Sequence, residues 1–146
     1  MCKHDYTKTM MMKLFMSRPD GKGGTVTECD FDRADDILRQ ADALTLGAPK
    51  ILYLVGWQYN GHDHRYPSFF EVNPDLKSPG DATAPESMLR FINKAAEQYN
   101  TVVSVHINFS DAYENSPLFE EYRSAGALIR NSKGEPAAIE EYNGQP

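Results

Sequence analysis

The chain has 146 residues, of which 40% are hydrophobic, 11% aromatic and 25% charged, a composition that suits one globular domain and excludes a disordered or membrane-embedded chain. Its formal net charge of −6, with Lys and Arg scattered along the sequence, argues against nucleic acid as a partner. The two cysteines, Cys2 and Cys29, form no disulfide framework, and no apolar run approaches the roughly 20 residues that would cross a bilayer.

The N-terminal part predicts one short strand. Residues 1–8 are expected to be disordered, and they do not begin a signal peptide, because Lys13 interrupts the apolar run that follows. Residues 9–17, TMMMKLFMS, are short and mostly apolar, which predicts a strand. This strand ends before Pro19, and we interpret the glycine-rich residues 20–24 as a flexible loop, since their spacing fits no phosphate-binding motif.

A helix and a buried strand come next. Apolar residues recur with a helical period over residues 31–46, Asp30 can cap the start of this helix, and Gly47 marks its end. Residues 50–57, KILYLVGW, are continuously apolar rather than alternating. Such a run predicts a strand that is buried on both faces.

A long connection precedes the second helix. Residues 59–84 show no clear periodicity, and loops of this length inside a domain are usually functional, so we expect a substrate loop here. Residues 83–100 predict a helix that opens with a capping box of Thr83 and Glu86. The β-branched run 101–108, TVVSVHIN, predicts a third strand.

The C-terminal part predicts a short helix and a hairpin. Ser116 and Pro117 open the helix, whose residues are LFEEYRSA. Residues 127–142 resemble a hairpin that turns at residues 131–134. No internal repeat or low-complexity tract is present.

The order of these elements is β-α-β-α-β-α-(ββ), which predicts one α/β domain over residues 1–146 with a parallel sheet and right-handed crossovers. Two closures of the sheet are open. A small doubly wound sheet would suit the length of the chain. A complete (β/α)8 barrel needs about 250 residues, so the chain would supply only its first three βα units.

Polar side chains follow the second and third predicted strands, where the ligand site of either parallel architecture lies. Because neighbouring parallel strands end at the same rim, these side chains should lie close together. The candidates after the second strand are Trp57, Gln58, His62 and Asp63, and those after the third are His106, Asn108, Asp111 and Tyr113.

The residue types support more than one chemistry. His62, His64 and His106, with Asp63, could hold a divalent metal ion in a hydrolase. Alternatively, Asp, His, Asn and Gln side chains recognise sugar hydroxyls, while aromatic rings such as that of Trp57 offer flat faces to a pyranose. A non-catalytic carbohydrate-binding domain would use the same residues. Each histidine could also be a structural, hydrogen-bonded residue.

Two motifs resemble a known family. LVGWQYNGHDHRYP, at residues 54–67, followed by VSVHINFSDAYENSP, at residues 103–117, is similar to the barrel core of the endo-alpha-N-acetylgalactosaminidases, glycoside hydrolase family 101. In that family a Gly-His-Asp motif closes the second barrel strand, and a His-x-Asn motif with a downstream Tyr closes the third. The similarity covers roughly residues 9–146.

The resemblance implies a retaining, endo-acting hydrolase that releases a Gal-GalNAc disaccharide from mucin-type O-glycans of glycoproteins, without a metal or other cofactor. It implies that Asp63 and His106 contact the sugar, with His62, Asn108, Trp57, Gln58 and Tyr113 nearby. Its nucleophile and general acid are expected beyond Pro146, so the chain would be the amino-terminal part of a TIM-type barrel, inactive alone. The implied partners are carbohydrate and the remainder of the barrel, not a membrane, and the implied location is extracellular.

Overall fold

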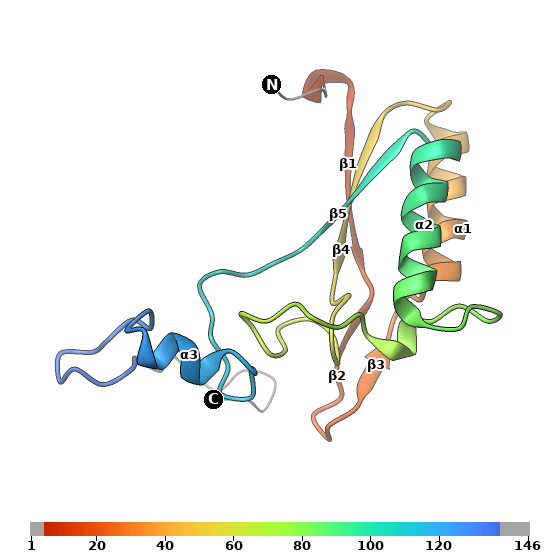
Figure 1. The fold of residues 1–146 in the computed structure, drawn as a ribbon. Helices are drawn as coiled ribbons and strands as arrows, with labels where there is room; N and C mark the ends of the chain where they lie inside the picture. The colour runs from red at the N-terminus through yellow and green to blue at the C-terminus, as the bar shows by residue number, and fades with distance from the viewer. Residues whose placement is uncertain (1–4, 138–146) are drawn as a thin grey trace.

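The computed structural model describes residues 5–137, and its centre is a three-stranded parallel sheet of order β1-β4-β5. The strands are β1 (Met10–Phe15), β4 (Lys50–Val55) and β5 (Thr101–Val105). Two long helices, α1 (Phe31–Leu44) and α2 (Ala84–Gln98), lie side by side on one face of this sheet (Figure 1). The structure therefore confirms an α/β fold with a parallel sheet.

Three 3-10 or α-helical turns and a small antiparallel pair complete the described elements. The pair is β2 (Ser17–Pro19) with β3 (Thr25–Thr27), and the turns are η1 (Tyr6–Lys8), η2 (Pro74–Leu76) and α3 (Phe119–Ser124). The helix α3 lies at the end of an arm that leaves the carboxyl end of β5 and runs away from the sheet (Figure 1). Between residues 5 and 137, no helix combines the length and the apolar character needed to cross a membrane.

Local signals fix the two long helices. The carboxylate of Asp30 accepts the N–H of Arg33 at the start of α1, and the hydroxyl of Thr83 accepts the N–H of Glu86 at the start of α2. Both caps satisfy N–H groups that have no partner inside the helix. The two predicted helices and their N-caps are confirmed, although the Glu86 carboxylate accepts the N–H of Ala82 rather than that of Thr83.

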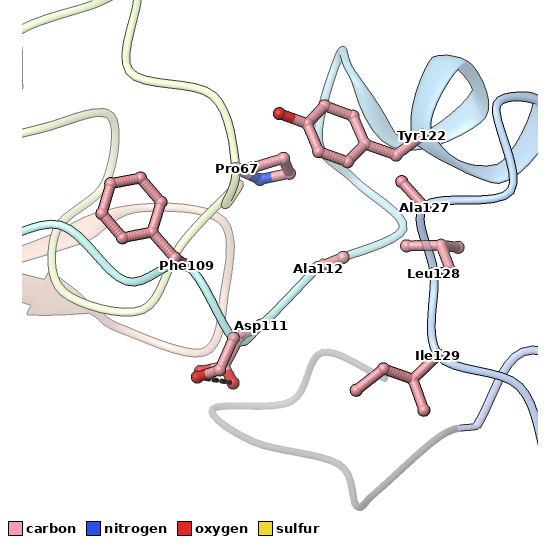
Figure 2. Close-up of a pocket in the computed structure, with 9 residues that line it drawn as sticks. Pro67, Phe109, Asp111, Ala112, Tyr122, Ala127, Leu128 and Ile129 are labelled. Carbon is pink, nitrogen blue, oxygen red and sulfur yellow. Dashed lines mark hydrogen bonds between the residues drawn. The ribbon is translucent and has the colours of Figure 1, made fainter.

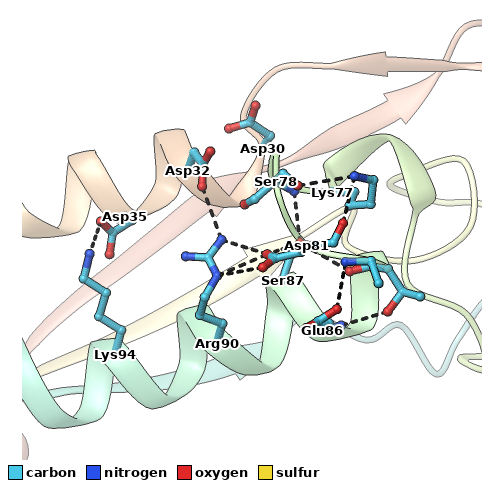
Figure 3. Close-up of polar contacts among 12 residues, drawn as sticks. Asp30, Asp32, Asp35, Lys77, Ser78, Asp81, Glu86, Ser87, Arg90 and Lys94 are labelled. Atoms are coloured by element: carbon cyan, nitrogen blue, oxygen red, sulfur yellow. Dashed lines mark hydrogen bonds and ion pairs between the residues drawn. The ribbon is translucent and has the colours of Figure 1, made fainter.

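Polar contacts join α1 to α2 and to the loop before α2 (Figure 3). Arg90 of α2 contacts Asp81 at 2.9 Å and Asp32 of α1 at 3.4 Å, while Lys94 contacts Asp35 at 2.7 Å. These pairs are partly exposed, so solvent screening keeps their contribution to stability small. They fix the packing direction of the helices, whereas the apolar side chains between helices and sheet provide most of the stability.

Among the described residues, helices cover one face of the sheet only, although Ile51 and Val55 of the central strand β4 are also buried on the other face. Side chains that point toward the helices pack into the core; they include Met12, Leu14, Leu52, Leu54, Val103 and Val105. Side chains alternate between the faces of a strand, so Met11, Phe15 and Val102 point the other way, and they are 52%, 39% and 43% exposed. Parallel sheets are normally covered on both faces, and this sheet is not.

Two sequence-based expectations concern the closure of the sheet and the glycine-rich residues 20–24. The sheet is not closed into a barrel within residues 5–137. Residues 20–24 form a loop, as predicted, and this loop is the turn between β2 and β3, where the Asp20 carboxylate accepts the N–H groups of Lys22 and Gly24. The β-branched run Thr25–Thr27, directly after the glycines, is the sequence pattern that indicates β3.

The termini are described in part. Of residues 1–8, which were expected to be disordered, residues 6–8 form the 3-10 turn η1, and residues 1–4 lie outside the described part of the chain. The predicted C-terminal turn is present, with the Gly134 N–H donating to the Asn131 carbonyl and a bridge between Arg130 and Pro136. Residues 138–142 of the expected hairpin lie outside the described residues.

Candidate functional site

Two glycines allow the chain after β4 to turn back against the β2 strand. A Cβ on Gly56, at φ +72°, would lie 2.0 Å from the carbonyl oxygen of Ser17, and one on Gly61, at φ +121°, would lie 2.5 Å from the Cα of Arg18. Next to this close approach, the N–H of His62 donates to the Ser17 carbonyl at 2.9 Å. The β2–β3 hairpin therefore fixes where the Gly-His-Asp motif lies at the rim.

The backbone of this loop is held in an uncommon conformation. Tyr59, Asp63 and Arg65 have φ values of +45°, +54° and +61°, in the left-handed region that favours glycine. Such positions cost of the order of 1–3 kcal/mol each and persist where the surroundings determine them, often at functional sites. The conformation at Asp63 accompanies the contact of its carboxylate with the Nδ1 atom of His62 at 3.3 Å.

The predicted rim is formed by His62, Asp63 and His106. The rings of His62 and His106 meet edge to face with their centroids 5.3 Å apart, and the Nδ1 atom of His62 lies 3.3 Å from a carboxylate oxygen of Asp63. The ring of Phe15, from the carboxyl end of β1, lies edge-on to His62 at 5.5 Å. Parallel strand ends thus bring together residues from three separate parts of the chain.

Main-chain and indole hydrogen bonds position His106. Its N–H donates to the carbonyl of Leu54 at 2.8 Å, which continues the β4–β5 pairing by one residue. Its carbonyl accepts the indole N–H of Trp57 at 3.1 Å. The Trp57 ring is largely buried and stacks on Phe69 at 6.3 Å, so Trp57 holds the rim together rather than offering a free face to a sugar.

Asn108 belongs to a polar turn beside the rim. Its amide nitrogen donates to the carboxylate of Asp111, and its amide oxygen accepts the N–H and the hydroxyl of Ser110. Both ends of the Asn108 amide therefore have partners within the loop after β5. The negative charge of Asp111 helps to raise the pKa of the Asp63 carboxyl.

Burial perturbs both ionisable groups of the Gly-His-Asp motif. Loss of solvent lowers the pKa of the His62 imidazole, an effect that the negative charge of Asp63 opposes. Loss of solvent raises the pKa of the Asp63 carboxyl, and the negative charge of Asp111 adds to this effect, while His62 opposes it. A neutral imidazole beside a partly desolvated carboxyl can donate and accept hydrogen bonds, as recognition of a hydroxyl group requires.

Other candidate residues lie beneath or beside the rim. Gln58 is fully buried and pairs with Val72 as an isolated bridge. Tyr113 is also buried, with its ring 6.0 Å from that of Tyr66. These two side chains support the loops and do not line an open surface.

His64 does not join the other two histidines. It is buried, its Nε2 atom lies 3.2 Å from the side-chain nitrogen of Asn115, and its ring lies edge-on to Tyr59. Over residues 5–137, no group of three or more His, Cys, Asp or Glu side chains is arranged to hold a metal ion. The described geometry therefore does not assemble the metal site considered for His62, His64 and His106.

Sequence reasoning missed the contribution of β1 to the rim. Lys13 and Phe15 lie on the uncovered face, and the positive charge of Lys13 lowers the pKa of both His62 and Asp63. The alternation of residues 11, 13 and 15 with the core-facing residues 12 and 14 carried this signal, because alternate side chains of a strand point to opposite faces.

Comparisons with known proteins show similarity at the level of the fold. No family model matches the chain, and no curated protein matches it in sequence. Solved structures of alpha-N-acetylgalactosaminidase NagBb from Bifidobacterium bifidum are similar to it. The Gal-NHAc-DNJ complex has a TM-score of 0.74 at 14% identity over 94% of this chain, and the GalNAc complex has a TM-score of 0.63 at 16% identity over 88%.

The match concerns a small part of those enzymes. The chain spans about a fifth of the length of the solved structures it matches, 21% in one case and 20% in the other. At this level of identity the similarity shows the fold alone. The chain therefore shares its fold with one part of those solved structures.

Proposed function

We propose that the rim formed by His62, Asp63 and His106 binds carbohydrate, and that the chain is part of a glycoside hydrolase. The observation that carries this proposal is the meeting of these three side chains at the carboxyl ends of β4 and β5, in a chain whose fold matches part of an alpha-N-acetylgalactosaminidase. In parallel α/β folds this end of the sheet is where ligands bind. A glycosidase-like fold implies a carbohydrate ligand.

The chemistry of the rim suits a sugar hydroxyl. The Asp63 side chain is largely buried, at 12% exposed, and its carboxylate can accept a hydrogen bond, while a neutral imidazole at His62 can either donate or accept one. The half-exposed ring of Phe15 provides an apolar surface at the same place. Directed polar groups beside an aromatic ring are the usual components of a sugar site.

We infer further that the sheet is the start of a (β/α)8 barrel. Two observations support this: the face of the sheet away from α1 and α2 carries exposed Met11, Phe15 and Val102, and the edges of β1 and β5 are unpaired among the described residues. Additional βα units would cover that face and pair with both edges. In the finer proposal, the complete enzyme is an extracellular, retaining, endo-acting hydrolase of mucin-type O-glycans, with its carboxylate pair on those other units.

Calorimetric titration of the 146-residue chain with N-acetylgalactosamine tests the carbohydrate proposal. We expect weak, saturable binding that falls at least tenfold in Asp63→Ala, because the directed hydrogen bonds of a carboxylate are lost. Asp36→Ala is the matched control, because Asp36 is an exposed carboxylate on α1. Absence of binding, or equal binding by Asp63→Ala and the unaltered chain, would overturn the proposal.

A further inference from the structure

A second concave surface lies beside the candidate rim (Figure 2). It is a hollow of about 160 Å³ between the loop after β5 and the segment that follows α3. Its wall is formed mainly by Pro67, Phe109, Tyr122, Leu128 and Ile129. In Figure 2 the ring of Tyr122 extends toward Pro67, and Leu128 and Ile129 close the opposite side.

The hollow is built from the same loops as the rim: Phe109 and Asp111 follow His106 in the loop after β5, and Pro67 follows Asp63 in the loop after β4. Asp111 lines the hollow, and its carboxylate accepts the amide N–H of Asn108 from the loop that carries His106. The same carboxylate lies close enough to Asp63 for its charge to raise the pKa of the Asp63 carboxyl. A ligand bound at His62, Asp63 and His106 therefore borders the hollow on its Asp111 side.

Size and chemistry restrict what the hollow can hold. Pockets for drug-sized ligands measure about 300–1,000 Å³, so a hollow of about 160 Å³ has room for one ring and not for an oligosaccharide or an acyl chain. Two of its three polar side chains, Ser110 and Asp111, already form hydrogen bonds with Asn108, and the third is the phenol of Tyr122. With few free polar groups and two aromatic rings, it suits an apolar group rather than a second sugar ring.

We propose that this hollow receives the apolar, non-sugar part of a glycoside whose sugar occupies the rim of His62, Asp63 and His106. This inference rests on the carbohydrate-binding function proposed above. It makes the chain selective: glycosides with an aromatic or branched aliphatic aglycone bind more tightly than glycosides of the same sugar with a methyl aglycone. Phe109, which is 83% exposed and stands at the mouth of the hollow, is the main specificity-determining residue.

The experiment compares phenyl and methyl α-N-acetylgalactosaminide on the 146-residue chain by calorimetric titration. We expect the phenyl glycoside to bind on the order of tenfold more tightly, because several apolar carbons leave water. Phe109→Ala and Ile129→Ala should each reduce the ratio of the phenyl-glycoside affinity to the methyl-glycoside affinity severalfold, toward one. Both side chains are exposed, at 83% and 74%, so neither substitution should prevent folding.

Leu89→Ala is the control, because Leu89 is a similarly exposed apolar side chain on α2, away from the hollow. Its phenyl-to-methyl ratio should match that of the unaltered chain. Equal affinities for the two glycosides, or a ratio that survives Phe109→Ala and Ile129→Ala, would overturn the aglycone site while leaving the sugar site in place. Failure of both glycosides to bind would refute the carbohydrate function itself, and the aglycone site with it.

Discussion

The imidazole rings of His62 and His106 meet edge to face, with their centroids 5.3 Å apart. They come from the loops after two adjacent strands, β4 and β5, and the hydrogen bond from the His106 N–H to the Leu54 carbonyl fixes the register between these strands. Nothing local in the sequence places the two rings together. Their proximity follows from parallel pairing, which brings successive strand ends to one rim.

Gly56 is expected to be irreplaceable for the position of the loop. In Gly56→Ala the new Cβ would lie 2.0 Å from the Ser17 carbonyl oxygen, at φ +72°, so either the loop or the β2–β3 hairpin must move. We expect a loss of roughly 3 kcal/mol or more in the free energy of unfolding, measured with urea. Gly47→Ala is the control: Gly47 has a similar φ of +75° with nothing within 4 Å of its Cβ position, and it should cost only about 1 kcal/mol. Equal costs would show that the close approach to Ser17 does not exist.

Two adjacent valines test which face of the sheet is covered. Val103 packs against the core beneath the helices, whereas Val102 is 43% exposed on the other face. Replacing Val103 with Thr buries a hydroxyl group and should destabilise the chain by about 1–2 kcal/mol. Val102→Thr should change the stability by no more than about 0.5 kcal/mol. A larger cost at Val102, again from urea unfolding, would mean that this face is already covered in the isolated chain.

The lowered pKa of His62 predicts how stability depends on pH. Burial disfavours the imidazolium, so the unfolded chain binds this proton more readily than the native state does. The contribution of neutral His62 to folding stability is therefore complete at pH values above the usual imidazole pKa of about 6.5. It is lost as the pH falls through the lowered pKa of the native state. The free energy of unfolding should drop more between pH 7.5 and pH 5 for the unaltered chain than for His62→Gln. A steeper fall in His62→Gln would contradict the account.

Sequence patterns predicted the elements that local rules determine. The caps at Asp30 and Thr83 located the starts of both long helices, and the unbroken apolar run of β4 showed that both faces of this strand are buried. The rim of Asp63 and His106 followed from the position of the polar residues after two parallel strands. In these cases the signal lies within a few residues.

What the sequence could not predict depends on contacts between distant residues. The indole of Trp57 looked available to a sugar, yet its N–H bonds to the His106 carbonyl and its ring is stacked on Phe69. His64, two residues from His62, turns away to Asn115, because the left-handed conformation at Asp63 redirects the chain between them. The closure of a sheet likewise depends on the pairing of strands far apart in the sequence, which no local pattern encodes.

Nuclear magnetic resonance of the isotope-labelled 146-residue chain, titrated with N-acetylgalactosamine, tests the central claim most directly. If the carboxyl ends of β4 and β5 form a carbohydrate site, the imidazole signals of His62 and His106 and the amide signal of Asp63 should shift together, with one common dissociation constant. Amide signals from the outer surface of α1, such as that of Arg39, should stay unchanged. Shifts confined to other parts of the chain, or no saturable shift at these three residues, would contradict the account.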